Sequence, residues 1–305
     1  MKTRVILATA GMTFLASFTT IAGKQAAVEL DSFAVVYLRY ILAFLVLWVI
    51  LHIRRERVVI DWKDWKLLLF LMGTGILLNQ NLFILSLKHT VPSHISLIYA
   101  TTSVWVMFMD WLSGKGHPEK RKVLSALLAI TGVGIVVGIS LFVFNREIFI
   151  GDVIILGATL SWASYTAFGK SMVQKYGPIK ITYLVLAGAM LVYTPLGLPR
   201  VLAVPWSNVS LLAILGILYM GLFTSGISYI LYYYILRHLD ASHLGLMVSA
   251  QPPTTVLISV LVGYETLKIN TILGMLFIGG GILLASRNSC APPPAIPPSE
   301  TGKSI

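Results

Sequence analysis

Two stretches that lie 149 residues apart decide the fold: residues 88–94 read Lys-His-Thr-Val-Pro-Ser-His, and residues 237–243 read Arg-His-Leu-Asp-Ala-Ser-His. Upstream, Ala-Ser-Phe-Thr at residues 16–19 matches Ala-Ser-Tyr-Thr at residues 163–166. Similarity of a chain to itself at a long and nearly constant offset indicates that one structural unit has been duplicated. The chain is therefore predicted to consist of two copies of one unit.

The composition places both copies in a membrane. Of 305 residues, 57% are hydrophobic and 11% are charged, and the mean hydropathy is +0.84. Soluble globular domains carry about 25% charged residues, so a water-soluble enzyme is excluded and the apolar excess must face lipid. The net charge of +11 is explained by the basic bias of cytoplasmic loops. No nucleic-acid partner is therefore expected.

Ten long apolar runs with few charged residues inside them are predicted to be transmembrane helices. The protein is therefore predicted to be an all-α polytopic membrane protein. β-Barrel strands are not predicted, because the runs are long and continuous, whereas barrel strands alternate over about ten residues. The ten predicted spans are residues 5–23, 33–52, 67–87, 93–112, 123–144, 151–172, 180–199, 209–236, 241–262 and 269–286.

Five spans fall in each copy, which we assign to residues 1–146 and 147–288. An odd number of spans means that the second copy enters the membrane from the opposite side, so the copies are inverted repeats. Inverted repeats are a recurrent plan of transporters, with the substrate site near the membrane midplane between the repeats. The remaining residues, 289–305, are rich in proline and are predicted to be a disordered cytoplasmic tail.

The distribution of lysine and arginine predicts the orientation. With the N-terminus in the cytoplasm, 17 of these residues fall on the cytoplasmic side and five on the other side. The five are Lys24, Lys88, Arg146, Arg200 and Lys268. Because basic residues in short loops resist translocation, both termini are predicted to be cytoplasmic.

Several residue patterns of the chain resemble those of a known family. The order of Trp162-Ala163-Ser164-Tyr165, Ala241-Ser242-His243, Gln251-Pro252-Pro253 and Gly263-Tyr264-Glu265, ending in a glycine-rich last helix, is similar to the EamA-type branch of the drug/metabolite transporter (DMT) superfamily. The resemblance covers nearly the whole chain. It implies a ten-helix carrier of the bacterial-type inner (plasma) membrane, often an exporter of amino acids or other small metabolites. One departure is Gly116, which stands at the position of Glu265 in the other copy.

Polar and aromatic residues at helical spacing predict where the substrate binds. Polar side chains inside a hydrocarbon slab are costly and usually face the bundle interior or a water-filled cavity. The alternative is that hydroxyl groups bond their own backbone or a neighbouring helix and that aromatic rings simply pack. The residues predicted to line the substrate cavity are Asn79, Tyr99, Thr102, Trp162, Tyr165, Ser225, Tyr229, Tyr232 and Gln251.

Four further residues are predicted to have a gating or structural role. Arg39 is a basic residue inside an apolar run, where it would attract an anionic substrate group or serve structure, the interpretation that we favour. Pro252 breaks the backbone hydrogen bonds of its helix. Asp110 is the deepest carboxylate and Glu265 lies at a helix end. With no ionisable relay at the midplane, transport is predicted to be facilitative, or weakly coupled through Asp110 or Glu265.

The sequence thus predicts an alternating-access transporter that exports small neutral or zwitterionic metabolites such as amino acids. The alternatives are an integral membrane enzyme such as a transferase, and a channel. An enzyme would need a midspan acid and base, a nucleophile or a metal cluster, and a channel would not need two mirrored gating halves. No catalytic residue, metal or cofactor is predicted, since the one cysteine, Cys290, builds neither a disulfide nor a thiolate site. The expected partners are a small-molecule substrate and lipid, with a monomer expected and a dimer as the alternative.

Overall fold

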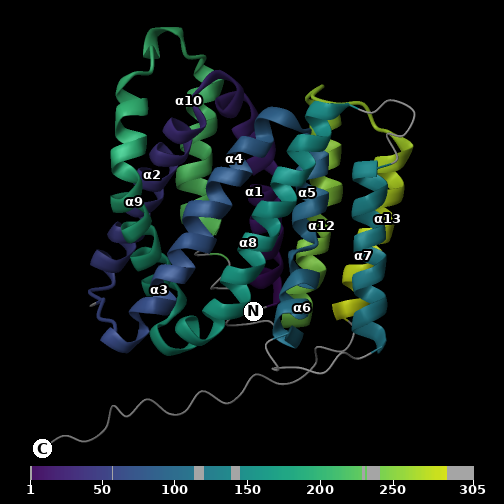
Figure 1. Ribbon diagram of the computed structural model, residues 1–305, viewed down its shortest axis with the longest axis horizontal. Helices are drawn as coiled ribbons and strands as arrows, with labels where there is room; N and C mark the ends of the chain where they lie inside the picture. Colours follow the sequence, from purple (N-terminus) through teal and green to yellow (C-terminus); the bar gives the residue numbers. More distant parts are fainter. Residues whose placement is uncertain are drawn as a thin grey trace, which may run out of the picture.

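The computed structural model describes residues 2–56, 58–112, 120–138, 145–228, 231 and 241–286. In these residues every regular element is a helix, and the helices run side by side as one bundle (Figure 1). In the first half the elements are α1 (Lys2–Glu29), α2 (Ser32–Ile53), η1 (Trp62–Asp64), α3 (Trp65–Leu71), η2 (Met72–Leu78), α4 (Asn79–His89), α5 (Pro92–Ala100), α6 (Thr102–Leu112) and α7 (Lys120–Gly138). In the second half they are α8 (Arg146–Tyr176), α9 (Pro178–Leu202), η4 (Trp206–Asn208), α10 (Leu211–Leu218), η5 (Tyr219–Ile227), α12 (Ala241–Leu261) and α13 (Ile269–Ser286).

Local chemistry explains where several of these helices begin and end. The side chains of Asp31, Asn145 and Ser210 cap α2, α8 and α10 by accepting hydrogen bonds from backbone N–H groups of the first turn. Pro92 begins α5, at a helix position where its missing N–H costs nothing. Gly177 separates α8 from α9 with a φ of 81°, a conformation that glycine adopts readily.

The described part of each of the ten predicted apolar runs falls largely on a helix or on a series of helices. Within the described residues, four segments are long and apolar enough to cross a membrane: Ser32–Ile53, Trp62–His89, Arg146–Gly169 and Ile179–Leu202. Three shorter apolar helical segments are Val123–Val136, Leu211–Ile227 and Ile269–Gly281. The protein is therefore an all-helical bundle with several spanning helices, while the count of ten spans stays a prediction.

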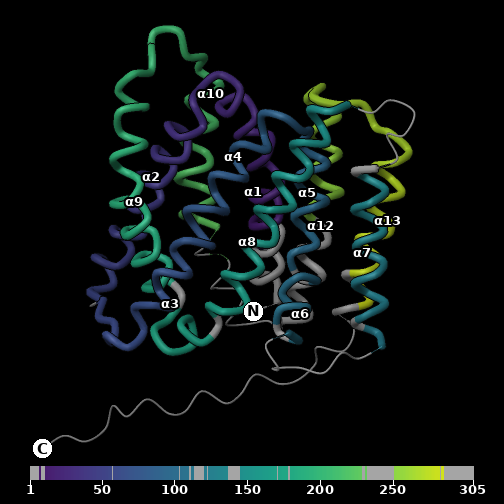
Figure 2. Tube along the Cα trace, viewed as in Figure 1, coloured from purple at the N-terminus to yellow at the C-terminus, as the bar shows by residue number. Residues whose placement is uncertain are grey.

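The helices of the two halves are intermixed rather than separated into two bodies. Figure 2 shows this by colour, since the purple and blue helices of the first half alternate with the teal, green and yellow helices of the second. Helix α2 packs on α9, α4 on α8, α1 on α10 and α12, and α7 on α13. The contacts between the halves therefore involve α1, α2, α4 and α7 of the first half.

Glycines bring α7 and α13 together at one edge of the bundle. A Cβ atom on Gly132 would lie 2.6 Å from Ile278 Cγ1 and 2.9 Å from the Ile278 nitrogen, and one on Gly281 would lie 2.7 Å from the Ser125 oxygen. Such spacing lets two helix backbones approach closely. Gly134, which the same helix carries two residues later, has no atom within 4 Å of its hypothetical Cβ. The packing of α7 on α13 therefore uses Gly132 and not Gly134.

Large apolar side chains divide between the interior and the outer faces. Tyr40, Leu47 and Ile84 belong to one continuous buried core that draws on both halves. On the outer faces, Leu191 of α9 is 69% exposed and Leu211 of α10 is 71% exposed. Leucine side chains on the outside of apolar helices are suited to contact with lipid.

Candidate functional site

Asn79 is a buried side chain of α4 that connects three helices. It is 1% exposed and follows directly after η2. Its Nδ2 donates to the Tyr99 hydroxyl at 3.0 Å and to the Ala158 carbonyl at 2.8 Å, while its Oδ1 accepts from Gln80 Nε2 at 3.0 Å. The structure thus brings Asn79 and Tyr99 together and joins them to α8 of the second half.

Arg39 is linked to this group through the ring of Phe83. It is 7% exposed, and its Nε donates to Ser225 Oγ at 3.2 Å. Its guanidinium carbon lies 5.7 Å from the centroid of the Phe83 ring, which in turn meets the Tyr99 ring edge-on at 6.1 Å. Burial excludes a side chain that extends into water at the membrane surface. Arg39 instead brings a positive charge to the aromatic and hydroxyl groups of the interior.

Two π-helices position these side chains, one in each half. Segment η2 runs over Met72–Leu78 and ends next to Asn79, and η5 runs over Tyr219–Ile227 and contains Ser225. The offset of 149 residues that relates the two copies carries η2 onto residues 221–227, inside η5. π-Helical turns are rare and are often found at functional sites. Their occurrence at matching places in both halves marks this region as the candidate site.

Side chains from other helices satisfy the backbone of η2 where its hydrogen-bond register changes. Ser161 Oγ donates to the Thr74 carbonyl at 2.7 Å, and the Tyr40 hydroxyl donates to the Ile76 carbonyl at 2.9 Å. Buried carbonyl groups need such partners, because an unpaired polar group in an apolar interior is costly. The π-helix is therefore stabilised by tertiary contacts from α8 and α2.

Trp162 and Tyr165 form an aromatic pair on α8 beside η2. Their rings are stacked, with centroids 5.0 Å apart and planes inclined by 26°. Tyr165 lies against Gly75, where a Cβ atom would come within 2.1 Å of Tyr165 Cδ2. Both side chains are partly exposed, so the pair packs beside η2 without being sealed inside the bundle.

Gln251 bonds the first half through its backbone carbonyl, next to Pro252 in α12. The Gln251 carbonyl accepts a hydrogen bond from Ser17 Oγ at 3.2 Å, and the Ser17 carbonyl accepts one from Thr255 Oγ1 at 3.2 Å. Ser17 is fully buried. These reciprocal bonds hold α1 to α12 at the level where Pro252 and Pro253 interrupt the helix hydrogen bonds.

The remaining predicted residues lie apart from this group. Thr102 Oγ1 donates to the Tyr99 carbonyl at 2.6 Å, which is the local backbone bond named above as the alternative role for a hydroxyl. Glu265 lies in the turn between α12 and α13, where its carboxylate accepts hydrogen bonds from Ser93. Tyr229, Tyr232, the side chain of Asp110 and the predicted tail at 289–305 lie outside the described residues.

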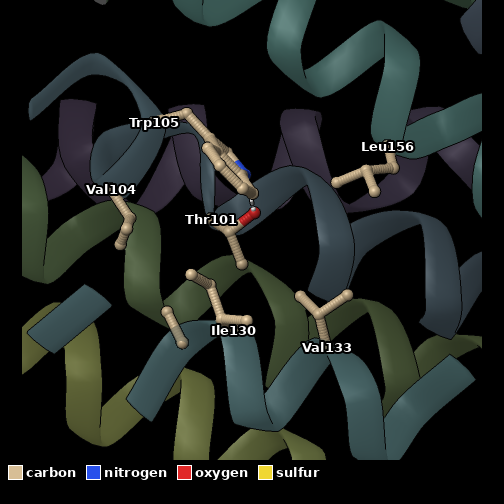
Figure 3. Close-up of a pocket in the computed structure, with 7 residues that line it drawn as sticks. Thr101, Val104, Trp105, Ile130, Val133 and Leu156 are labelled. Atoms are coloured by element: carbon tan, nitrogen blue, oxygen red, sulfur yellow. Dashed lines mark hydrogen bonds between the residues drawn. The ribbon is translucent and has the colours of Figure 1, made fainter. Parts of the chain in front are cut away.

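A cavity of about 140 Å³ lies between α6, α7 and α8, next to Thr101 at the end of α5 (Figure 3). It is apolar, and its polar groups bond each other, since Trp105 Nε1 donates to Thr101 Oγ1 at 3.1 Å. Ile130 and Val133 approach Thr101 and Leu156 from α7 (Figure 3). None of the residues predicted to line the substrate cavity borders this space. The lining residues are Thr101, Val104, Trp105, Ala129, Ile130, Val133 and Leu156.

Comparison with known proteins decides the family. A model of the EamA-like transporter family matches residues 3–138 and again residues 149–287. The chain belongs to the EamA-like transporter family. Two family matches in one chain identify the duplicated halves, and the family makes this an integral membrane transporter rather than an enzyme.

Relatives of this EamA-family protein agree over almost its whole length. An "Uncharacterized transporter" of Archaeoglobus fulgidus is 26% identical over 287 residues, which cover 93% of this chain and 97% of that protein. "Uncharacterized transporter YoaV" of Bacillus subtilis is 21% identical, with 92% and 96% covered. A solved structure titled "Crystal structure of protein" has a TM-score of 0.63 at 18% identity and covers 93% of this chain. That likeness shows a shared fold.

Several residues of the EamA-family bundle were not singled out by the sequence analysis. Ser17 joins α1 to α12, and Thr19 Oγ1 lies 2.8 Å from Thr224 Oγ1 of η5. Asp152, which the sequence places at the edge of an apolar run, is 1% exposed and hydrogen-bonded. The internal repeat offered a signal for Ser17, because it lies in the matched stretch 16–19, but no sequence pattern indicated that Asp152 would be buried.

Among the described residues, no group of three or more His, Cys, Asp or Glu side chains is placed to hold a metal ion. The candidate site is therefore a set of amide, hydroxyl, aromatic and guanidinium groups. Such groups can bind and orient a small molecule by hydrogen bonds and ring contacts.

Proposed function

We propose that this EamA-family transporter works by alternating access and exports small neutral or zwitterionic metabolites such as amino acids. The observation that carries the proposal is that buried polar bonds cross between the two halves at mid-bundle. Asn79 of the first half bonds Ala158 of the second, and Arg39 of the first half bonds Ser225 of the second. A substrate that replaces such bonds would change how the halves hold each other.

The chemistry of the site favours a zwitterion. Arg39 can pair with a carboxylate in two parallel hydrogen bonds, and the exposed part of the Trp162–Tyr165 pair offers ring faces that attract an ammonium group. Asn79 and Tyr99 add uncharged hydrogen-bonding groups. A single guanidinium group suits a substrate with one acidic group better than a nucleotide, which carries several negative charges.

The orientation is part of the same proposal. We place both termini in the cytoplasm and the protein in a bacterial-type inner membrane, with ten spans divided between residues 1–146 and 147–288. The excess of lysine and arginine on one side supports this orientation. A monomer is part of the proposal, with a dimer as the alternative.

Uptake into proteoliposomes tests the proposal. Labelled amino acids, nucleosides and amphipathic amines are offered with and without an imposed pH gradient, using the wild type and the variants Asn79→Ala, Trp162→Ala and Gln251→Ala. The matched control is Leu191→Ala, because this side chain is on the outer surface. We expect saturable uptake of an amino acid that falls at least about tenfold in Asn79→Ala and Trp162→Ala and is unchanged in the control.

Three results would contradict parts of this proposal. Substrate flux that is equal in the wild type and in all variants would show that the substrate does not bind in the Asn79 region. Accumulation driven by the pH gradient would overturn facilitative transport. An observed single-channel conductance would show that the protein is a channel and not a carrier.

A further inference from the structure

A second polar network joins the halves at one end of the bundle, away from the Asn79 group. It surrounds the turn between α4 and α5, at the upper end in the view of Figure 1. Asp152 of α8 is 1% exposed; its Oδ1 accepts from Thr90 Oγ1 at 2.6 Å, and its Oδ2 lies 2.9 Å from His94 Nδ1. A carboxylate of the second half is thereby buried against two side chains of the first half.

A second carboxylate holds the same turn from another direction. Glu265, in the turn after α12, accepts from the Ser93 backbone nitrogen at 3.2 Å and from Ser93 Oγ. Ser93 is fully buried at the start of α5. A carboxylate at a helix N-terminus satisfies otherwise unpaired N–H groups and interacts favourably with the helix dipole. Glu265 of the second half is thus the cap of a helix of the first half.

Lys24 completes the network from the first half itself. Its Nζ donates to the Thr90 carbonyl at 2.8 Å and to the Leu87 carbonyl at 2.5 Å, at the C-terminal end of α4. A cation is favourable there, because the last carbonyls of a helix carry partial negative charge. The charges of Lys24 and Glu265 also attract each other. The α4–α5 turn is thereby held by one cation of its own half and two carboxylates of the other.

The backbones meet closely at this point. A Cβ atom on Gly151 would lie 2.6 Å from Thr90 Cβ and 2.7 Å from the Thr90 nitrogen. Glycine lets α8 come near enough for Asp152, the next residue, to reach Thr90 and His94. Separation of the halves at this end would therefore break the hydrogen bonds of Asp152 and Glu265 together, because these bonds cross between the halves.

The sequence shows that the two carboxylates are absent from the other copy. The offset of 149 residues places Gly116 at the position of Glu265, and the upstream offset of 147 residues places Val5 at the position of Asp152. The duplicated unit thus carries this acidic pair once. The two repeats exchange roles between the inward-open and outward-open states, and these states need not be equally stable. A contact that exists in just one of the two states raises the population of that state.

We propose that Lys24, Thr90, Ser93, His94, Asp152 and Glu265 form the gate that closes one end of the substrate path. Asp152 and Glu265 act as positioning residues, and release of their bonds to the α4–α5 turn is the step that opens this end. The inference rests on the proposed alternating-access function and assigns the gating role predicted for Glu265 to a defined set of contacts. Under the proposed orientation this is the outer gate.

The test measures the gate directly by the distance between two spin labels. Cys290 is replaced by serine, and labels are attached at Lys88→Cys in the first half and Lys268→Cys in the second, both next to the network. Pulsed dipolar spectroscopy then records the distances in lipid nanodiscs without any substrate, for the parent protein and for Asp152→Asn, Asp152→Ala and Glu265→Gln. The matched control is Asp61→Asn, a carboxylate in an exposed salt bridge with Lys175.

We expect the gate variants to populate a longer distance, with the ratio of long to short distances raised by about fivefold for each hydrogen-bonding group lost. The control leaves the distribution unchanged. Ser93→Ala is the fourth gate variant, because it removes the hydroxyl bond to Glu265 while the Ser93 backbone nitrogen still donates to that carboxylate, and it shifts the same ratio. Distributions that stay the same in the folded Ser93→Ala and Glu265→Gln proteins would overturn the gate.

The outcome separates this inference from the proposed substrate class. Distances that respond as expected in a protein that transports none of the offered solutes support the gate and contradict the substrate class. If the protein shows saturable amino-acid flux but the distances between the spin labels are the same in all four gate variants, the gate is overturned and the proposed function stays supported.

Discussion

Arg39 Nε donates a hydrogen bond to Ser225 Oγ at 3.2 Å, and this bond ties a buried positive charge in α2 to the π-helix η5 of the other half. Ser225 Oγ also donates to the Met220 carbonyl, five residues earlier, at 3.1 Å. The serine therefore accepts from the cation while it satisfies a carbonyl of the π-helix. A hydroxyl in this place serves both the charge and the irregular backbone.

Ser225→Ala tests that double role. Removal of the hydroxyl takes an acceptor from a buried guanidinium and a donor from the Met220 carbonyl, so we expect stability to fall by about 1–3 kcal/mol. The control is Ser207→Ala, whose hydroxyl is exposed and bonds only its neighbour Asn208. Thermal unfolding in detergent measures both variants. Equal melting temperatures would show that the Arg39–Ser225 bond has no energetic role.

The Asn79–Tyr99 pair can be measured by a double-mutant cycle. Asn79→Ala removes the donor to both Tyr99 and Ala158, whereas Tyr99→Phe removes only the phenol acceptor. We expect Asn79→Ala to cost about 1–3 kcal/mol because it leaves the buried Ala158 carbonyl unpaired. Tyr99→Phe should cost less, and the double variant should cost less than the sum of the two. Strict additivity in unfolding free energy would contradict a direct interaction.

Two glycines in η2 provide a matched test of the π-helix. A Cβ atom on Gly75 would come within 2.1 Å of the Tyr165 ring, whereas one on Gly73 would meet nothing within 4 Å. Gly75→Ala should therefore displace Tyr165 and lower stability by about 1–3 kcal/mol, and Gly73→Ala should be neutral or slightly stabilising. The two melting temperatures, together with substrate flux, check this. A Gly75→Ala protein as stable as Gly73→Ala would mean that Tyr165 does not rest on η2.

An ionic cluster at the other end of the bundle predicts a pH dependence. Lys175 Nζ donates to Asp61 Oδ2 at 2.5 Å and to Asp64 Oδ2 at 2.8 Å. The hydrogen bond from Lys175 lowers the pKa of the Asp61 carboxyl below its ordinary value. A carboxyl with a lowered folded-state pKa contributes stability above its unfolded pKa, and this contribution is lost as pH falls through the folded-state value.

We therefore expect the melting temperature of the wild type to fall more than that of Lys175→Gln between about pH 6 and about pH 3. The difference should be small and should shrink in high salt, because the cluster is exposed to solvent. Lys180→Gln is the control, since Lys180 pairs with Glu56 and contacts neither aspartate. Parallel pH curves for wild type and Lys175→Gln would exclude the predicted contribution.

Hydropathy and internal similarity predicted much of the architecture. The apolar runs fall on helices because the length and composition of a spanning helix are set by the bilayer, which is a property of each segment alone. The pairing of Asn79 with Tyr99 was predicted only as membership of one cavity, since spacing places a residue on a face of its own helix and does not identify the partner helix. The π-helices had no sequence signal, because their carbonyls are satisfied by Ser161 and Tyr40 from other helices.

By itself, the sequence determined that this is a duplicated helical membrane protein of the EamA-like family, because local composition and self-similarity need no tertiary information. Only the tertiary structure decided that Asn79 bonds Ala158, that Arg39 bonds Ser225, and that Asp152 is buried against Thr90 and His94. These contacts join residues 58 to 186 positions apart. These contacts depend on how closely the helices pack, and glycines such as Gly75 and Gly151 permit the close approach. The sequence of a single helix does not specify which helix packs against it.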